Sequence, residues 1–358
     1  MSISNREDIR PDKTTKDTKR IKCVVWDLDN TLWNGVLLED EEVSLRKGVT
    51  SVVHALDARG ILQSIASKND YNTAMDKLGE LGLREYFLYP QIGWDAKSSY
   101  ITNIAKALNI SVSAIAFIDD QPFEREEVGT SLPQVACYDA DDFRGLLDDP
   151  KFIPRFVTED SRSRRRMYIN DMERNMQEEA FTGPKEEFLA TLDMKLTIFS
   201  ASEKDLHRAE ELTLRTNQLN ATGYSYSYDE LNFFIQSEKH RLLMAMLTDR
   251  FGSYGHIGLA LVEQGNEIWT IKLLLMSCRV MSRGVGAIML NHMITLARKE
   301  GVLLRAEFLP NGKNRMMEIT YRFAGFENYK TINDLLILEN RLKTPQAFPD
   351  YVEIYINE

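Results

Sequence analysis

Short apolar runs alternate with longer amphipathic stretches through the first part of the chain. The runs at residues 21–27, 61–67 and 114–120 have the length of buried strands, whereas "VTSVVHALDARG" at 49–60 has the periodicity of a helix. Strands that alternate with helices indicate a parallel sheet with right-handed crossovers. We therefore predict an α/β domain over residues 20–142.

A different pattern begins near residue 186. "RLLMAMLTDR", "GHIGLALVEQ" and "EIWTIKLLLMSCRV" are typical of three successive strands joined by turns. A Gly-rich turn and an apolar helix follow in "MSRGVGAIMLNHMITLARKEG", and a further strand precedes a helix that begins near Asn314. This order predicts an α+β domain over residues 186–358.

Between these two patterns, the charged segment 143–185 has helical periodicity, so we predict a helical linker there. The polar residues 1–19 are predicted to form a flexible tail. A length of 358 residues exceeds the usual size of a single core, which agrees with two domains.

Charge and composition narrow the classes of partner. The net charge of -10 argues against nucleic acid as the main partner. No apolar run approaches the roughly 18 residues of a membrane span, and the N-terminal residues contain no signal-peptide core. We therefore expect no membrane association and a cytoplasmic location.

Polar side chains gather at the predicted carboxyl ends of the strands in the first domain, where parallel sheets bind ligands. Transfer of a phosphoryl group from a monoester needs a nucleophile, a proton donor, cations and a hydroxyl that holds an oxygen. The polar groups at these strand ends meet all of these needs. They are Asp27, Asp29, Thr31, Ser67, Lys97, Asp119 and Asp120.

Each of these groups has a predicted catalytic role. Asp27 attacks phosphorus, and Asp29 protonates the leaving alkoxide and later deprotonates water. Ser67 and Lys97 hold the phosphoryl oxygens. Thr31 is a predicted substrate contact.

Hard oxygen ligands at the same edge predict Mg²⁺ as the cofactor. Asp27 and one carboxylate of the pair Asp119 and Asp120 are the predicted metal ligands, helped by the backbone carbonyl of Asp29.

The order D-x-D-x-T, then Ser, then Lys, then a D-D pair resembles the haloacid dehalogenase superfamily of aspartyl-phosphate hydrolases. The resemblance implies a Rossmann-like fold, and it favours Asp120 over Asp119 as the metal ligand. Local structure offers alternatives for other residues: Lys97 as a solvated helix N-terminus, and Ser67 as a helix N-cap. Asn69 of "SKND" either contacts substrate or caps the following helix.

Spacing limits what covers this site. Thr31 and Ser67 are separated by 35 residues (32–66), and Ser67 and Lys97 by 29 (68–96). A helix and a strand use most of each gap, which leaves no room for a large cap domain. The site is therefore predicted to be open, as suits a phosphate carried on something bulky, or a site covered by a partner protein or by the second domain.

The Gly-rich turn of the second domain starts a helix directly after a strand, and such helix N-termini bind phosphate. The arrangement resembles the Gcn5-related N-acetyltransferase fold, whose pyrophosphate loop reads Q/R-x-x-G-x-G/A. Met281, Gly284 and Gly286 match it, with Met in place of Gln or Arg. We predict Arg283, Gly284 and Gly286 as substrate-binding residues; the alternative is that the glycines only permit close helix packing.

Across almost the whole chain, the combination resembles the FkbH-like family of polyketide pathways. The carrying stretches are "WDLDNTLW", "SKND", "FIDDQPFEREEV", "RTNQLN" and "SCRVMSRGVG". The resemblance implies that a glyceryl group moves from 1,3-bisphosphoglycerate, a phosphorylated three-carbon donor, to the phosphopantetheine thiol of an acyl carrier protein, with loss of phosphate. The product is a precursor of extender units of the methoxymalonyl type.

Two rival interpretations stay open. One is a phosphatase fused to an acyltransferase that uses another acyl donor or a small amine, and the other is a docking module without catalysis. A basic cluster at Arg162, Arg164, Arg165 and Arg166 either binds an acidic carrier protein or braces the linker.

Ala66 stands where members of this family often have Cys, immediately before "SKND". Cys23, Cys137 and Cys278 are odd in number and far apart, which predicts reduced, buried thiols and no metal cluster. None of them lies at the equivalent position, so we expect direct transfer without a glyceryl-enzyme intermediate.

Overall fold

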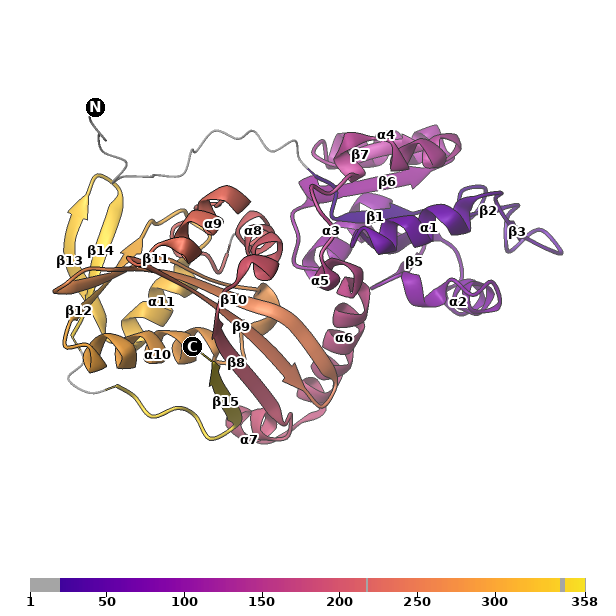
Figure 1. Cartoon of the computed structure of the whole chain (residues 1–358). Coiled ribbons are helices and arrows are strands. Elements are labelled where there is room, and N and C mark those ends of the chain that lie inside the picture. Colours follow the sequence, from indigo (N-terminus) through magenta and orange to yellow (C-terminus); the bar gives the residue numbers. More distant parts are fainter. Residues whose placement is uncertain (1–19, 217, 342–344, 358) are drawn as a thin grey trace, which may run out of the picture. The chain divides into compact units, whose positions relative to one another are not determined.

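The computed structural model describes residues 20–216, 218–341 and 345–357. The described chain divides into two compact units, which meet in sequence between residues 169 and 170 (Figure 1). Of the predicted linker, residues 143–169 belong to the first unit and 170–185 to the second. The predicted tail, residues 1–19, lies outside the described residues.

The first unit contains a parallel five-stranded sheet in the order β5-β4-β1-β6-β7. In β1, Val24 and Trp26 belong to one core cluster with side chains of α1 (Val49–Ala58) and α2 (Tyr71–Glu80). The alternating Cys23 and Val25 are also fully buried. A central strand covered on both faces explains the continuous apolar run. The strands are β1 (Cys23–Trp26), β4 (Leu62–Lys68), β5 (Gln91–Gly93), β6 (Ile115–Asp119) and β7 (Ala136–Asp139).

Helices connect these strands, as the alternating pattern predicted. α3 lies beside α4, and α1 lies beside η3 and α5. A small hairpin of β2 (Trp33–Asn34) and β3 (Ser44–Leu45) follows the first strand. The helices are α1 (Val49–Ala58), α2 (Tyr71–Glu80), α3 (Lys97–Ala107), α4 (Pro122–Ser131) and α5 (Glu159–Arg162), with short turns η1 (Arg84–Tyr86), η2 (Val112–Ala114), η3 (Ala140–Leu147) and η4 (Pro150–Phe152).

The second unit contains an eight-stranded sheet in the order β13-β14-β12-β11-β10-β9-β8-β15. The pairs β11–β12 and β8–β15 are parallel, and the other neighbours are antiparallel. The strands are β8 (Met194–Ser200), β9 (His240–Asp249), β10 (Gly252–Gln264), β11 (Ile268–Met276), β12 (Leu303–Phe308), β13 (Phe326–Ile332), β14 (Leu335–Asn340) and β15 (Val352–Asn357).

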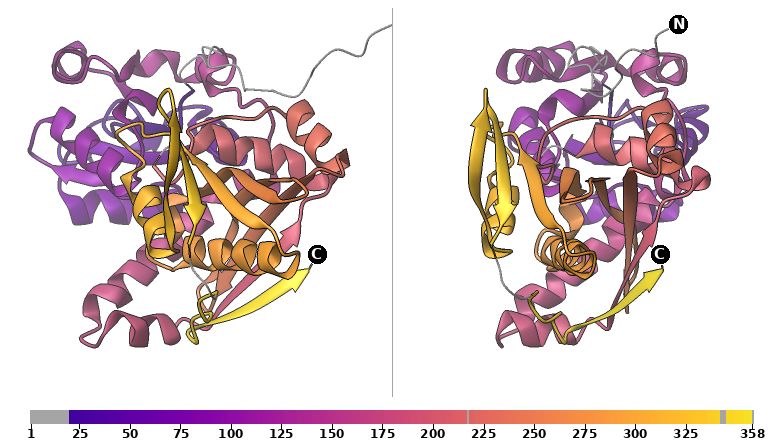
Figure 2. Two further views of the ribbon diagram at one scale, coloured as in Figure 1. Left: turned by 90° about the vertical axis from the view of Figure 1, so that its left-hand side faces the viewer. Right: turned by 60° about the vertical axis from the view of Figure 1, so that its left-hand side comes forward.

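Two helical layers cover this sheet (Figures 1 and 2). α8 and α9 pack on one set of side chains from β9, β10 and β11, and α10 and α11 pack on the alternate set. α6 begins in the first unit and ends in the second. The elements are α6 (Arg164–Ala180), α7 (Lys185–Ala190), α8 (Leu206–Arg215), α9 (Tyr228–Gln236), α10 (Val285–Lys299), α11 (Arg315–Phe323), η5 (Glu203–Asp205) and η6 (Cys278–Val280).

These elements confirm the mixed α/β class and the change of pattern between the two parts of the chain. Within the described ranges, every helix is too short or too polar to cross a bilayer.

Candidate active site

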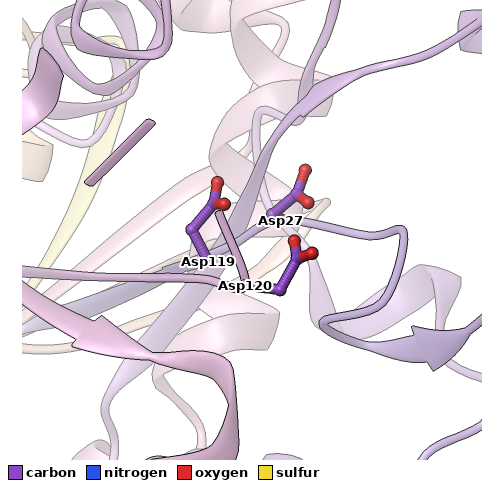
Figure 3. Close-up of side chains that lie close together, drawn as sticks. All are labelled: Asp27, Asp119 and Asp120. Atoms are coloured by element: carbon purple, nitrogen blue, oxygen red, sulfur yellow. The ribbon is translucent and has the colours of Figure 1, made fainter. Parts of the chain in front are cut away.

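The carboxyl ends of β1 and β6 bring three carboxylates together. Asp27 follows β1 directly, and its N–H donates to the carbonyl of Ile118 in β6 at 2.9 Å. Asp119 is the last residue of β6, and Asp120 follows it. One carboxylate oxygen from each of the three aspartates lies within 4.8 Å of the others (Figure 3).

Lys97, the first residue of α3, compensates part of this charge. Its side chain is 3% exposed, and its ammonium lies 2.9 Å from Asp27 Oδ1 and also contacts Asp119. Burial acts to lower the pKa of Lys97, but the charges of Asp27 and Asp119 outweigh it and raise the pKa. The lysine therefore stays protonated in a buried position and is not a solvated helix terminus.

Asp119 and Asp120 differ in their partners. Asp119 contacts Lys97 through one oxygen and accepts a hydrogen bond from Gln121 N at 2.8 Å through the other. Burial and the charge of Asp27 raise the pKa of Asp119 to about 7. Asp120 accepts from the Thr31 hydroxyl at 3.3 Å, and its own N–H donates to that hydroxyl at 3.0 Å. Since both oxygens of Asp119 already serve protein groups, the geometry favours Asp120 as the direct metal ligand.

Asp29 lies on the same edge, held by three donors. Its Oδ1 accepts from Trp33 Nε1 at 2.8 Å and from Leu37 N at 3.0 Å, and its Oδ2 accepts from Asn69 Nδ2 at 3.1 Å. Burial raises the pKa of Asp29, and the hydrogen bonds from Leu37 and Trp33 offset only part of that effect. A carboxyl group with a raised pKa is suited to give a proton to a leaving oxygen.

Adjacent residues of the "SKND" stretch make different contacts. Asp70 is the N-cap of α2 and accepts from Thr73 N at 2.9 Å, so neither Ser67 nor Asn69 caps that helix. Ser67 lies near the end of β4, beside β1, with 1% of its surface exposed. Asn69 is also buried and holds Asp29. The hydrogen bond from Asn69 to Asp29 joins two loops. Apart from the "SKND" motif itself, nothing in the sequence predicts this contact.

The donor set fits a hard divalent cation. Asp27, Asp119 and Asp120 offer only oxygen ligands. With all three ionised, three negative charges and the one positive charge of Lys97 leave a net charge of two negative, which a divalent ion neutralises. The carboxylate of Asp29 is engaged by other groups, so a contribution from Asp29 would come through its backbone carbonyl, as the sequence predicts.

The site has no cap domain of its own. Residues 32–96, all of which the structure describes, hold β2, β3, α1, β4, α2, η1 and β5. Two aromatic side chains close in sequence to the site residues are largely exposed: Trp94 at 71%, before Lys97, and Phe123 at 72%, after Asp120. The lack of room for a large cap between Thr31 and Lys97 agrees with these elements, and the openness of the site stays a prediction.

The predicted binding residues of the second unit are engaged by the chain itself. Gly284 is the N-cap of α10 with φ 76°, and a Cβ there would clash with the Tyr351 hydroxyl. Gly286 packs closely against a side chain of β11. Arg283 is buried and pairs with Glu178 at 2.9 Å. These contacts support the packing alternative for both glycines and give Arg283 a structural partner.

The predicted basic cluster is only partly exposed. Arg164 is buried and donates to the carbonyl of Gly60 at 2.6 Å, and Arg165 pairs with two carboxylates of the first unit. Both side chains thus brace the first unit. Arg162 and Arg166 are the two exposed members of the cluster.

No family model and no curated protein matches the sequence. Among solved structures, the chain is similar to the N-terminal part of a Bacteroides fragilis protein that contains a phosphatase domain complexed with Mg. The TM-score is 0.35 and the identity 29%, over 38% of this chain and 42% of that one. The present chain thus spans less than half the length of that match.

N-Acetyltransferases are also among the similar structures. The ribosomal-protein-S18-alanine N-acetyltransferase of Escherichia coli has a TM-score of 0.32 and 20% identity, over 43% of this chain and 99% of that one. The PaiA N-acetyltransferase of Thermoplasma acidophilum, in complex with coenzyme A, has a TM-score of 0.34 and 19% identity, over 41% and 99%. Each likeness covers only part of the present chain.

Proposed function

We propose that the first unit is a Mg²⁺-dependent phosphatase that forms an aspartyl phosphate on Asp27. The observation that carries this proposal is the burial of Lys97 against Asp27 and Asp119, with Asp120 alongside. Three carboxylates with a single buried cation leave an excess of negative charge that a divalent ion offsets. A bound Mg²⁺ neutralises charge on the transferred phosphoryl oxygens.

The residues divide the reaction into two displacements. An Asp27 oxygen forms a bond to phosphorus while the bond from phosphorus to the alkoxide breaks, and Asp29 gives its proton to that alkoxide. Asp29, now ionised, takes a proton from water, and the water oxygen attacks the same phosphorus. Inorganic phosphate leaves, and Asp27 is regenerated. In this proposal, Lys97 and Ser67 hold phosphoryl oxygens in both steps.

Phosphate release from a small phosphate ester tests this proposal. A chelator should abolish release and added Mg²⁺ should restore it, while Asp120→Asn should raise the Mg²⁺ concentration for half-maximal activity by at least about tenfold. Asp70→Asn is the matched control, because it changes an exposed carboxylate at the same edge and keeps the helix cap. Release that is insensitive to the chelator would contradict the assignment.

Within this chemistry we propose that the donor is 1,3-bisphosphoglycerate and the acceptor the phosphopantetheine thiol of an acyl carrier protein. The thiol attacks the acyl carbon, a carbon–sulfur bond forms, and the 1-phosphate leaves. Asp27 then acts on the 3-phosphate monoester, whose alkoxide needs Asp29 as acid. The motif resemblance and the lack of a large cap within residues 32–96 support this proposal, and the glyceryl-carrier product suits synthesis of polyketide extender units.

Intact-mass analysis of carrier protein separates the two stages. Carrier incubated with enzyme, Mg²⁺ and 1,3-bisphosphoglycerate should gain a glyceryl group without phosphate. With Asp27→Asn enzyme, the carrier should instead retain a phosphoglyceryl group. No mass gain, together with turnover of acetyl-coenzyme A and a small amine, would favour the alternative acyltransferase.

Docking of an acidic carrier is proposed to involve the exposed Arg162 and Arg166. Reversal of both charges should raise the KM for carrier and leave hydrolysis of a small phosphate ester unchanged. Arg84→Glu, at another exposed arginine of the same unit, is the control. An unaltered KM for carrier would remove these arginines from the interface.

A further inference from the structure

Two parallel strands of the second unit separate part of the way along their length. β11 and β12 pair from Ile268 opposite Leu303 to Ile271 opposite Ala306, and the described register ends there. Residues 272–276 of β11 continue toward η6 and the start of α10. An extended ligand with amide groups could pair with such a strand edge while a phosphate lay at the helix N-terminus. The gap is therefore the natural path for a pantetheine arm.

The chain's own residues 219–224, which we call the strap, fill this gap. Ala221 is central to it. Its N–H donates to Leu274 O of β11 at 2.9 Å, and its carbonyl accepts from Leu309 N, just beyond β12, at 3.0 Å. The strap thus joins the two separated strands by backbone hydrogen bonds on both sides.

A second bond lengthens the pairing with β11. The N–H of Met276 donates to the carbonyl of Leu219 at 2.9 Å, so Asn220 and Leu275 form an antiparallel bridge. The polar groups of β11 that a pantetheine arm would use are therefore already paired with the strap.

Asn314, at the start of α11, fixes the strap from the other side. Its Nδ2 lies 3.1 Å from the carbonyls of Asn220 and Ala221 and 2.9 Å from that of Leu309. Asn314 is 1% exposed, and Asn220 and Ala221 are fully buried. The Asn314 amide thus contacts both the strap and the segment just beyond β12, and it holds these two segments together.

The strap also has its own local structure. The Asn220 side chain accepts from Thr222 N at 3.2 Å and Gly223 N at 2.9 Å, and donates to Tyr224 O at 3.1 Å. This turn holds the strap in a compact shape that does not depend on a ligand.

Side chains of the second unit also lie beside the phosphate end of the path. Arg283 pairs with Glu178, and the Tyr351 hydroxyl lies against Gly284 at the start of α10. These contacts involve parts of the chain that are distant in sequence from the strap. Arg283 thus has a partner within the chain, and Tyr351 crowds the start of α10.

We propose that the strap is a permanent internal occupant of the gap between β11 and β12, so that the second unit takes no coenzyme A thioester. To enter, a pantetheine arm would have to replace three backbone hydrogen bonds and expose two fully buried residues. The inference goes beyond the proposed phosphatase and does not rest on it. Any acyl group that the chain transfers would then have to arrive activated in another form, such as an acyl phosphate.

Hydrogen exchange of the full chain, with and without millimolar coenzyme A or acetyl-coenzyme A, tests this inference. The amides of Ala221, Met276 and Leu309 should exchange slowly, and neither compound should change their rates. If either compound speeds exchange in the strap and slows it at residues 272–276, the gap opens to pantetheine and the inference is wrong.

Asn314→Ala sharpens the test. Exchange of the strap amides should rise by about tenfold or more, because the substitution removes an amide that contacts two strap carbonyls. Asn340→Ala is the matched control, because Asn340 makes a similar bond to Ala324 O at 2.8 Å elsewhere in this unit. Equal strap exchange in the two variants would refute the role of Asn314. If Asn314→Ala does not fold, hydrogen exchange of the unmodified chain with and without coenzyme A alone decides whether the inference holds. Phosphatase activity is measured separately and tests only the proposed function of the first unit.

Discussion

The two units use the ends of their parallel strands in opposite ways. In the first, three carboxylates lie together beside one buried lysine, which pairs with Asp27 and Asp119, and burial together with the charge of Asp27 raises the pKa of Asp119. In the second, the chain itself pairs the backbone groups of β11 beyond the point where β12 departs. Buried charge that lacks compensation is costly, whereas paired backbone groups are not. Carboxylates that outnumber their cationic partners therefore indicate a ligand site. A strand edge whose backbone groups are already hydrogen-bonded to the chain indicates a structural role.

The largest effect should come from Asp27→Asn. The amide is a poor nucleophile and a poor Mg²⁺ ligand, so phosphate release should fall by about a thousandfold or more. Asn314→Ala, which loosens the second unit, should leave release unchanged. Steady-state assays of both variants, with circular dichroism to verify folding, test the contrast. Substantial release by a folded Asp27→Asn enzyme would exclude the aspartyl-phosphate mechanism.

Lys97→Met should remove both activity and stability. It leaves two buried carboxylates without their cation, which should lower the free energy of unfolding of the first unit by about 3–5 kcal/mol. Urea denaturation followed by tryptophan fluorescence suits this measurement, because Trp26, Trp33 and Trp94 lie in the first unit.

The double variant Lys97→Met/Asp119→Asn provides the control. Neutralising the second carboxylate should recover part of the lost stability but none of the activity. If Lys97→Met alone is as stable as the unmodified chain, the charges around it are not coupled as the distances indicate.

The fold could be predicted from the sequence where local periodicity decides it. The strand–helix alternation of the first unit and the strand series of the second both appear in the pattern. The boundary between the two units lies inside α6 and could not be predicted, because the sequence of this helix is highly charged and suggests a helix exposed to solvent. Arg174 in that helix is 1% exposed and pairs with Asp249 at 2.6 Å, and a partner so far along the chain has no local signal.

The candidate site divides in the same manner. Asp27, Asp119 and Asp120 could be placed together because parallel strand ends share an edge. The hydrogen bond from Asn69 to Asp29 depends on how two loops pack, and the sequence left that residue between two roles. The strap escaped prediction because a bridge between Asn220 and Leu275 leaves no periodicity in either segment.

Asn69→Ala should have an intermediate effect on the first unit. Without the hydrogen bond from Asn69, the Asp29 carboxyl group is no longer held in the orientation needed for proton transfer. We therefore expect kcat to fall by roughly tenfold to a hundredfold, with KM little changed. Asn72→Ala, at an exposed position in α2, is the matched control. A purely structural role would instead lower the melting temperature and spare kcat.

Trp33→Phe should shift a pH profile with little change in the maximal rate. Trp33 donates to the carboxylate of Asp29, which favours the ionised form, so its loss should raise the pKa further. Asp29 must be protonated to act as acid, so kcat/KM falls as pH rises through that pKa. The basic limb should therefore move to higher pH in Trp33→Phe and stay in place in the exposed control Trp94→Phe. If the basic limb does not move in Trp33→Phe, that limb reports the titration of a group other than Asp29.

The smallest effect on catalysis is expected at the thiols. Burial raises the pKa of Cys23 and Cys137, so neither provides a ready thiolate, and Ala66 offers none beside Ser67. If the carrier thiol attacks the donor directly, replacing Cys23, Cys137 or Cys278 by Ser should leave transfer intact. Cys23→Ser buries a hydroxyl in β1 and should cost about 1–3 kcal/mol of stability without changing turnover. Intact-mass analysis of enzyme mixed with donor but no carrier should show no adduct; a glyceryl thioester trapped on any of these cysteines would instead establish a two-step route through the protein.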